Sequence, residues 1–355
     1  MSKTYNILIM GASYGSLLGL KMLMAGHKVT LICLPAEADL INQDGILVRM
    51  PVRGRDGLVD VRSQKLPGTL AAAGPADVDP SDFDLVCLAM QEPQYRLAGV
   101  RELLDAVARA KVPCMSIMNM PPLPYLARLP GLDVKQLQAC YTDAGVWANF
   151  DPACMTLCSP DPQAFRPPEE KVNVLQVSLP TNFKAARFVS DAHTQILRDL
   201  QAGIEAARFD AGDGPLELPV KLKVHESVFV PLAKWSMLLT GNYRCVQQDA
   251  MRPIREAVHA DLDASRAIYN WVSDLCVALG AARDDMVPFE KYANAAQGLA
   301  KPSSAARALA AGAQNIERVD KLVQLIAKQR GLSNASVDAA VALVDGWLEK
   351  NRAQA

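Results

Sequence analysis

Short apolar runs alternate with helical patterns over the first third of the chain. Asn6 to Met10 and Val29 to Leu34 have the length and composition of buried parallel strands. Asp84 to Met90 and Val112 to Met118 have the same character, and Tyr95 to Ala110 between them has helical periodicity. This alternation predicts an α/β fold with a Rossmann-like, doubly wound parallel sheet.

The middle of the chain is less regular. Val48 to Val61 is broken by two glycines and favours an antiparallel hairpin, whereas residues 67–82 are rich in Pro, Gly, Ala and Asp and favour a linker. Three later runs are expected to be strands, and one long helical pattern follows them: Ala139 to Trp147, Cys154 to Cys158, Val172 to Leu179, and then Phe183 to Phe209.

Strand signals end near residue 224, and helical periodicity continues to the C-terminus. The turn-rich stretch 210–220 separates the two patterns. We therefore predict two domains: residues 1–212 form the Rossmann-like domain, and residues 213–355 form an all-α domain. The expected helical segments of the second domain are 224–246, 253–280, 284–298, 303–328 and 335–351.

A glycine-containing turn lies between the first two predicted strands. Gly11 follows the first strand, and Gly15 opens the helix that leads to the second. A helix N-terminus at this place attracts an anion through its free N–H groups and dipole, and glycine allows a pyrophosphate to approach closely. The spacing departs from G-x-G-x-x-G, with Ser13 and Ser16 at the second and third positions. The context favours a dinucleotide-binding turn, and the alternative is a turn that only packs the helix on the sheet.

Charge and cysteine content exclude several classes of function. Lys plus Arg number 37 and Asp plus Glu 38 in 355 residues, so nothing favours nucleic acid or a membrane surface as a partner. No run of eighteen apolar residues occurs, and the N-terminus leads directly into a predicted core strand, which argues against a cleaved signal peptide. The eight cysteines form no C-x-x-C and no metal spacing, so we expect free thiols, no metal site and a cytoplasmic location.

Several segments resemble a known family when they are taken together. They are Gly11 to Gly19, Asp84 to Gln94, Asn119, the stretch from Leu232 through Lys234 to Asn242, and Ser303 to Gly312. In this order the chain resembles the ketopantoate reductases (2-dehydropantoate 2-reductases). The likeness of the Lys234 to Asn242 helix is moderately specific, whereas the glycine turn is shared by many dinucleotide-binding proteins.

The resemblance implies a NAD(P)H-dependent reductase of a 2-oxo acid or related ketone. Lys234 would be the general acid that protonates the carbonyl oxygen, and Asn242 and Ser304 would line the substrate pocket. Asn119 would lie near the nicotinamide. Matched in the same way, the cofactor-binding residues would be Gly11, Ser13, Tyr14, Gly15, Ser16, Leu34, Gln91 and Asn119.

The chain departs from the family at polar positions. Leu34 stands where the family usually has an arginine for the NADP 2′-phosphate, and no Asp or Glu stands there for NAD, so the residues at this position leave the choice of cofactor open. From the resemblance we expect NADP, with NAD as the alternative. Gln91 replaces a lysine, and Leu238 replaces an asparagine. The family's substrate-binding glutamate falls on Asn315-Ile316, and Glu317 could take its place only after a shift of the alignment. These exchanges favour a substrate other than ketopantoate, larger or more apolar.

Lys234 fits the proposed chemistry. A ketone gains negative charge on oxygen as hydride arrives, and a positioned ammonium stabilises that charge and supplies the proton. A lysine beside Trp235 can instead reach the surface and bury only its stem. Two other functions stay open: an opine-dehydrogenase-like reductive condensation, and a dinucleotide-binding protein without turnover. A homodimer through the helical domain is compatible with that domain's apolar content.

Overall fold

The computed structural model describes residues 3–354, which form two compact units. The first unit contains the residues up to Met90, Gln94–Met118 and Val146–Glu226. The second contains Gln91–Pro93, Asn119–Gly145 and the residues from Ser227 on. The change of unit after Glu226 comes later than the predicted boundary at 212/213, because residues beyond 212 still contribute two strands, β13 and β14, to the first unit.

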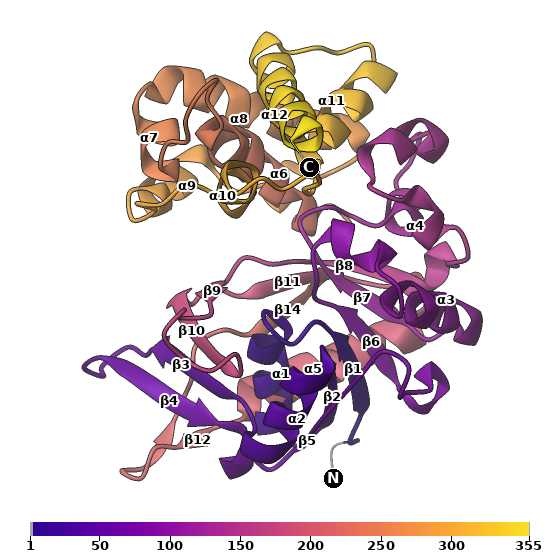
Figure 1. Ribbon diagram of the computed structural model, residues 1–355, viewed down its shortest axis with the longest axis vertical. Coiled ribbons are helices and arrows are strands. Elements are labelled where there is room, and N and C mark those ends of the chain that lie inside the picture. The colour runs from indigo at the N-terminus through magenta and orange to yellow at the C-terminus, as the bar shows by residue number, and fades with distance from the viewer. Residues whose placement is uncertain (1–2, 355) are drawn as a thin grey trace. The chain divides into compact units, whose positions relative to one another are not determined.

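An eight-stranded sheet is the centre of the first unit (Figure 1). Its strand order is β14-β11-β8-β7-β6-β1-β2-β5, and all neighbours are parallel except β11 and β8. The predicted Rossmann-like sheet is therefore confirmed. In chain order the strands are β1 (Asn6–Met10), β2 (Lys28–Ile32), β5 (Thr69–Ala73), β6 (Leu85–Leu88), β7 (Cys114–Ile117), β8 (Met155–Ser159), β11 (Phe183–Ala186) and β14 (Leu222–His225).

Two smaller sheets complete the strands of this unit. The four-stranded sheet β4-β3-β10-β9 contains the predicted hairpin, β3 (Leu47–Pro51) with β4 (Leu58–Arg62), together with β10 (Val174–Leu179) and β9 (Gln163–Phe165). A short hairpin joins β12 (Phe209–Asp210) to β13 (Pro215–Leu216).

Helices α1 (Gly15–Met24), α2 (Pro35–Asp44), α3 (Val100–Ala110) and α5 (Asp191–Ala206) belong to the same unit. α1 packs against α5 and the sheet, and every residue of α1 is buried. The strand residues beneath it, such as Ile7 and Ile9, are fully buried as well. The continuous apolar runs of the sequence are the core of this unit because both faces of a parallel sheet are covered.

The second unit is helical. Its helices are α4 (Leu123–Leu126), α6 (Lys234–Met237), α7 (Ile254–His259), α8 (Leu262–Leu279), α9 (Phe289–Ala296), α10 (Ser304–Ala310), α11 (Val319–Gln329) and α12 (Ala335–Ala353). The ends of α8 follow local rules: the Asp261 side chain accepts a hydrogen bond from the Ala264 N–H, and Gly280 ends the helix at φ +121°. The prediction that strands give way to helices after residue 224 is correct beyond the end of β14 at His225.

Several local predictions are wrong. Ala139 to Trp147 is not a strand but parts of two 3₁₀ helices, Val134–Cys140 and Ala144–Trp147. The linker 67–82 contains β5, which pairs with β2 along its whole length. The pattern 183–209 begins with strand β11, and helix α5 starts only after the Ser190 side chain caps it. The segment 224–246 is not one helix, as described below. The segment 253–280 divides into α7 and α8, and 303–328 divides into α10 and α11.

For β5, β11 and α5, pairing with a distant strand or side-chain capping overrides a weak local preference. The cysteine prediction is confirmed: all eight are free thiols, and all but Cys33 are buried.

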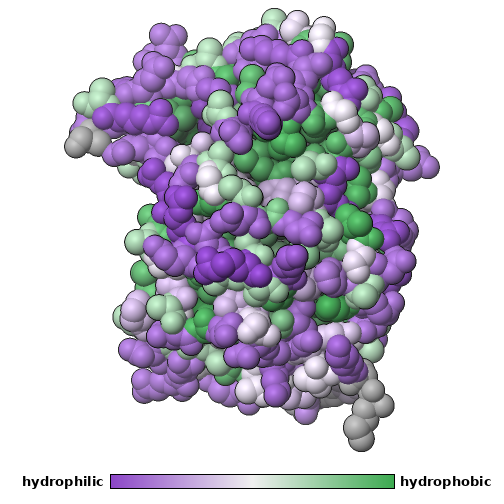
Figure 2. Space-filling view, turned by 90° about the vertical axis from the view of Figure 1, so that its right-hand side faces the viewer, coloured by the Kyte–Doolittle hydropathy of each residue, from purple (hydrophilic) through white to green (hydrophobic). Residues whose placement is uncertain are grey.

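The described residues include no helix that is long and apolar enough to span a bilayer. On the face shown in Figure 2, hydrophilic side chains cover most of the surface and hydrophobic ones show between them.

Candidate functional site

The glycine turn has the geometry that the sequence predicts. Gly11 has φ +109°, and a Cβ on it would lie 2.6 Å from Met90 Cγ and 2.9 Å from the Ala89 carbonyl oxygen. A Cβ on Gly15 would lie 2.6 Å from Ile9 Cγ2, so this glycine lets α1 approach β1 closely. Both positions therefore require glycine.

The N-terminus of α1 can accept an anion. Its first turn contains no acidic residue, and no side chain caps it. Ser13 is exposed, whereas the Ser16 hydroxyl is buried and donates to the Ala12 carbonyl. The Tyr14 side chain anchors the turn to a distant segment, because its hydroxyl donates a hydrogen bond to the Pro162 carbonyl at 2.7 Å. The Ser16 and Leu17 N–H groups donate to the Ser13 and Tyr14 carbonyls at 3.3 and 3.1 Å, so it is the glycine cradle and the positive end of the α1 dipole that fit a pyrophosphate.

Two more of the predicted cofactor-binding residues, Leu34 and Gln91, have exposed side chains. Leu34 follows β2 and is 75% exposed, and Gln91 is an exposed residue after β6. Neither side chain brings a charge to a dinucleotide.

A second cluster lies wholly within the helical unit and centres on Glu317. Asn119 Nδ2 donates to Glu317 Oε2 at 3.4 Å, and the Glu92 N–H donates to Glu317 Oε1 at 3.3 Å. Glu92 is itself buried, and its carboxylate accepts hydrogen bonds from the backbone N–H and the hydroxyl of Thr142 at 3.0 and 2.9 Å. Three segments far apart in the sequence thus hold one carboxyl group.

The protonation of Glu317 is unusual. Burial raises the pKa of Glu317 to about 7, against the opposing effect of the hydrogen bonds from Glu92 N–H and Asn119. Asn119 Oδ1 is buried and has no hydrogen-bond partner within residues 3–354. A buried acceptor without a partner is costly unless a ligand or water satisfies it. The cluster therefore offers a carboxyl group that can titrate near neutral pH beside an open amide oxygen.

The helix that carries Lys234 and Asn242 is irregular. A 3₁₀ turn (Val230–Ala233) leads into α6, a π-helix (Leu238–Asn242) follows, and a 3₁₀ turn (Tyr243–Cys245) ends the segment. Because a π-helix has more residues per turn than an α-helix, residues four apart in it, such as Leu238 and Asn242, do not lie one above the other as they would in an α-helix. π-helical turns are frequent at functional sites.

Tyr243 joins this segment to Glu317. The Tyr243 hydroxyl donates to the Glu317 carbonyl at 2.6 Å and accepts a hydrogen bond from the Val319 N–H at 3.0 Å. Lys234 and Asn242 are partly buried, and Leu238 is 3% exposed. Lys234 and Asn242 thus lie on a segment that Tyr243 joins by hydrogen bonds to Glu317 and to the first residue of α11.

The predicted Ser304 is the exposed first residue of α10. Its neighbour Ser303 is buried, donates to the Asn242 carbonyl at 2.8 Å and caps α10. Asn315 accepts a hydrogen bond from Arg352 at 3.4 Å. It is therefore Glu317, two residues later, that contacts Asn119, as the shifted alignment requires.

Sequence reasoning missed Glu92 and Thr142. Glu92 lies inside the segment Asp84 to Gln94 that resembles the family, but nothing there indicates a role for this residue, and its partner Thr142 is 50 residues away in a segment predicted as a strand. No local signal marks either of them.

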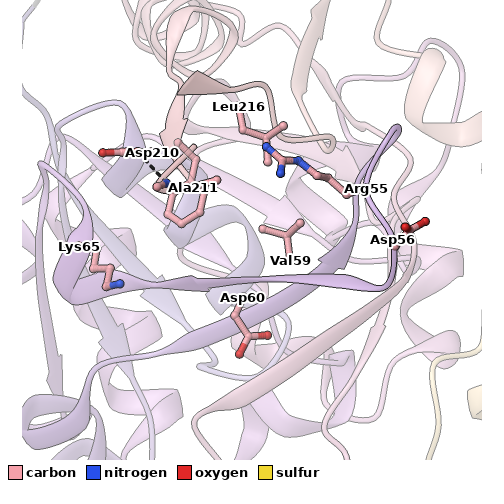
Figure 3. A pocket seen from close by; sticks show the side chains of 10 residues that line it. Arg55, Asp56, Val59, Asp60, Lys65, Asp210, Ala211 and Leu216 are labelled. Atoms are coloured by element: carbon pink, nitrogen blue, oxygen red, sulfur yellow. Dashed lines mark hydrogen bonds between the residues drawn. The ribbon is translucent and has the colours of Figure 1, made fainter. Parts of the chain in front are cut away.

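A hollow of about 560 Å³ lies elsewhere, in the first unit (Figure 3). Val59, Phe209 and Leu216 give it apolar walls, and Arg55 and Lys65 stand on different sides of it. The exposed Arg55–Asp213 ion pair joins the β3–β4 hairpin to the β12–β13 hairpin, and both hairpins contribute residues to this hollow. None of the predicted site residues lines it, and within residues 3–354 no group of three or more His, Cys, Asp or Glu side chains is suited to a metal ion.

The sequence matches no protein-family model, and no curated protein matches it significantly. Solved structures do match. A candidate ketopantoate reductase from Ralstonia solanacearum MolK2 has a TM-score of 0.65 at 16% identity, over 99% of both chains. The 2-dehydropantoate 2-reductase from Methylococcus capsulatus has a TM-score of 0.65 at 14% identity, over 98% of this chain and 97% of its own.

A D-mandelate dehydrogenase, solved with NADH and anilino(oxo)acetate, has a TM-score of 0.62 at 13% identity, over 98% of this chain and 99% of its own. At these identities the comparisons establish a shared fold. The resemblance to ketopantoate reductases is thus confirmed for the fold, including its helical C-terminal part.

Proposed function

We propose that this protein is a nicotinamide-dependent oxidoreductase that reduces a 2-oxo acid or a related ketone. The observation that carries the proposal is the hydrogen bond between Asn119 and Glu317. Tyr243, which follows the segment that bears Lys234, donates a hydrogen bond to the Glu317 carbonyl. In this cluster Glu317 supplies a carboxyl group, which the unshifted alignment lacks at Asn315-Ile316.

The glycine turn supports a dinucleotide as the cofactor. The cradle at Gly11 and the acid-free first turn of α1 fit a pyrophosphate. When bound, a reduced nicotinamide supplies the hydride. Ser13, Tyr14 and Ser16 at the turn position the phosphates, with Asn119 toward the nicotinamide and Leu34 and Gln91 as uncharged flanking contacts.

The helical unit provides the groups for the substrate. Lys234 Nζ donates a hydrogen bond to the substrate carbonyl oxygen and gives up its proton as the alkoxide forms. Asn242 and Ser304 line the pocket. Glu317 accepts a hydrogen bond from a substrate hydroxyl or donates one when it is protonated, and the open Asn119 Oδ1 accepts a second.

The substrate is proposed to be a 2-oxo acid with an apolar or aromatic group. Leu238, which is buried, removes an amide that would hold a hydroxylated chain. The D-mandelate dehydrogenase that shares this fold was solved with anilino(oxo)acetate, a 2-oxo acid that has an aromatic ring. A site built from apolar groups selects by size and shape, whereas one with polar groups rejects substrates that leave them unpaired.

The test is a titration of the purified protein with NADH and NADPH, followed by nicotinamide fluorescence. Cofactor oxidation is then measured with phenylglyoxylate, ketopantoate and pyruvate. We expect binding of a cofactor and turnover fastest with phenylglyoxylate. Lys234→Ala should lower kcat by about 10²-fold or more with little change in cofactor affinity, whereas Lys328→Ala, an exposed lysine on α11, should leave both unchanged.

Each negative outcome has a distinct meaning. No binding of either cofactor would refute the oxidoreductase proposal. Binding without turnover across the panel would favour a dinucleotide-binding protein that has no reductase activity. Turnover fastest with ketopantoate would keep the reaction and refute the substrate class.

A further inference from the structure

Two charged side chains meet near the carboxyl end of β2, although Leu34, the residue matched to the family's arginine, is itself uncharged. Arg166, just after β9, donates from Nη2 to Glu37 Oε1 in the first turn of α2. The two residues are 129 positions apart. Burial and the charge of Glu37 raise the pKa of the Cys33 thiol to about 12, and the charge of Arg166 lowers it. Because Cys33 directly follows β2, both charged groups lie near the end of this strand.

The segment that brings Arg166 also contacts the glycine turn. Its Pro162 carbonyl accepts the hydrogen bond from Tyr14 at the start of α1. Residues 162–166 therefore run from the α1 N-terminus to the α2 N-terminus. In a Rossmann-like fold these are the places of the pyrophosphate and of the adenosine ribose.

The local chemistry favours an unphosphorylated ribose. Pro35 occupies the first turn of α2 and has no N–H to offer a phosphate, and Glu37 places a negative charge in the same turn. Arg166 is the cation beside this carboxylate, and its guanidinium is already paired with it. A 2′-phosphate here would bring about two further negative charges next to Glu37.

We propose that Glu37, oriented by Arg166, accepts a hydrogen bond from the 2′-hydroxyl of the adenosine ribose, so that the protein prefers NADH to NADPH. Within residues 3–354, Glu37 Oε2 receives no hydrogen bond, and the side chain keeps 14% exposure through which a ligand can reach it. The inference rests on the proposed dinucleotide site. It replaces the NADP that the resemblance implies with NAD.

The test is the ratio of the dissociation constants of NADPH and NADH, measured by calorimetry without substrate. We expect the wild-type protein to bind NADH at least about tenfold more tightly, because like charges disfavour the phosphate. Glu37→Gln should lower that ratio about tenfold or more. Glu37→Asp keeps the charge and should retain the preference, and Arg166→Gln should also retain it because the carboxylate remains.

Glu290→Gln is the matched control, since Glu290 forms an exposed ion pair with Arg266 in the other unit and should leave the ratio unchanged. Tighter binding of NADPH by the wild type, lost in Arg166→Gln, would overturn the inference and assign Arg166 to a 2′-phosphate. An unchanged ratio in Glu37→Gln would also overturn it, while leaving the dinucleotide site intact. Binding of neither nucleotide would refute the proposed function together with this inference.

Discussion

Asn119 and Glu317 are 198 residues apart in the chain, and a 3.4 Å hydrogen bond from Asn119 Nδ2 to Glu317 Oε2 brings them together. Asn119 follows β7 by two residues, and Glu317 precedes α11 by two. The Glu92 N–H binds the other carboxylate oxygen. This relationship gives the proposed active site a carboxyl group whose pKa burial raises to about 7.

Glu317→Gln should reduce catalytic efficiency. The amide keeps the size of the side chain but accepts on only one of its two terminal atoms, so either the Glu92 N–H or the Asn119 Nδ2 loses its acceptor. We expect kcat/KM to fall by about 10- to 100-fold, the range for losing a hydrogen bond to a charged group. Steady-state kinetics should show the loss, and Glu349→Gln, an exposed change on α12, should show none.

The same carboxyl group makes stability depend on pH. Its pKa is about 7 in the folded protein and about 4.5 without burial, so the folded state binds more protons between these values. Stability contributed by Glu317 is therefore greatest at low pH and falls as pH rises from about 4.5 to 7, by up to about 3 kcal/mol.

Urea unfolding of the wild type and of Glu317→Gln at pH 5, 6, 7 and 8 checks this dependence. The wild type should lose stability relative to the variant as pH rises, and the difference should level off above about pH 7. A difference that grows in favour of the wild type with rising pH would contradict it.

Gly15→Ala should destabilise the first unit. The new Cβ would lie 2.6 Å from Ile9 Cγ2, so α1 must move away from β1. We expect a loss of about 1–3 kcal/mol in urea unfolding, together with weaker cofactor binding. Gly346→Ala in α12 is the matched change with nothing within 4 Å of the new Cβ. It should gain about 0.5–1 kcal/mol, because alanine loses less backbone entropy in a helix.

Asp320→Ala should be strongly destabilising. Asp320 is fully buried, and Arg318 Nε and Nη2 each donate to it at 2.9 Å. Removing the carboxylate leaves the Arg318 guanidinium, which is 7% exposed, with only Asp345 as a counter-charge. We expect a loss of about 3–5 kcal/mol.

The matched change is Glu290→Ala, which breaks the exposed pair with Arg266 and should cost less than about 1 kcal/mol. Equal losses of unfolding free energy in the two variants would contradict a role for burial.

Local pattern was enough to predict much of this protein. The apolar runs at Asn6 and Val29, with Gly11 and Gly15 between them, predicted the first β–α–β unit because strand, turn and helix preferences are set by residues within one or two turns. The periodicity after residue 225 predicted the helical unit for the same reason. Local pattern also placed Lys234 and Asn242 in one helical segment, though not its π-helical turn.

Only the tertiary structure decided which polar groups meet. Glu317 contacts Asn119, and Arg166 pairs with Glu37, although no local spacing relates either pair. The alanine-rich β5 has little strand propensity and forms because β2 offers it a ladder of hydrogen bonds. Hydrogen bonds and ion pairs between distant segments depend on how the chain folds back on itself, and burial then sets the pKa of a residue such as Glu317.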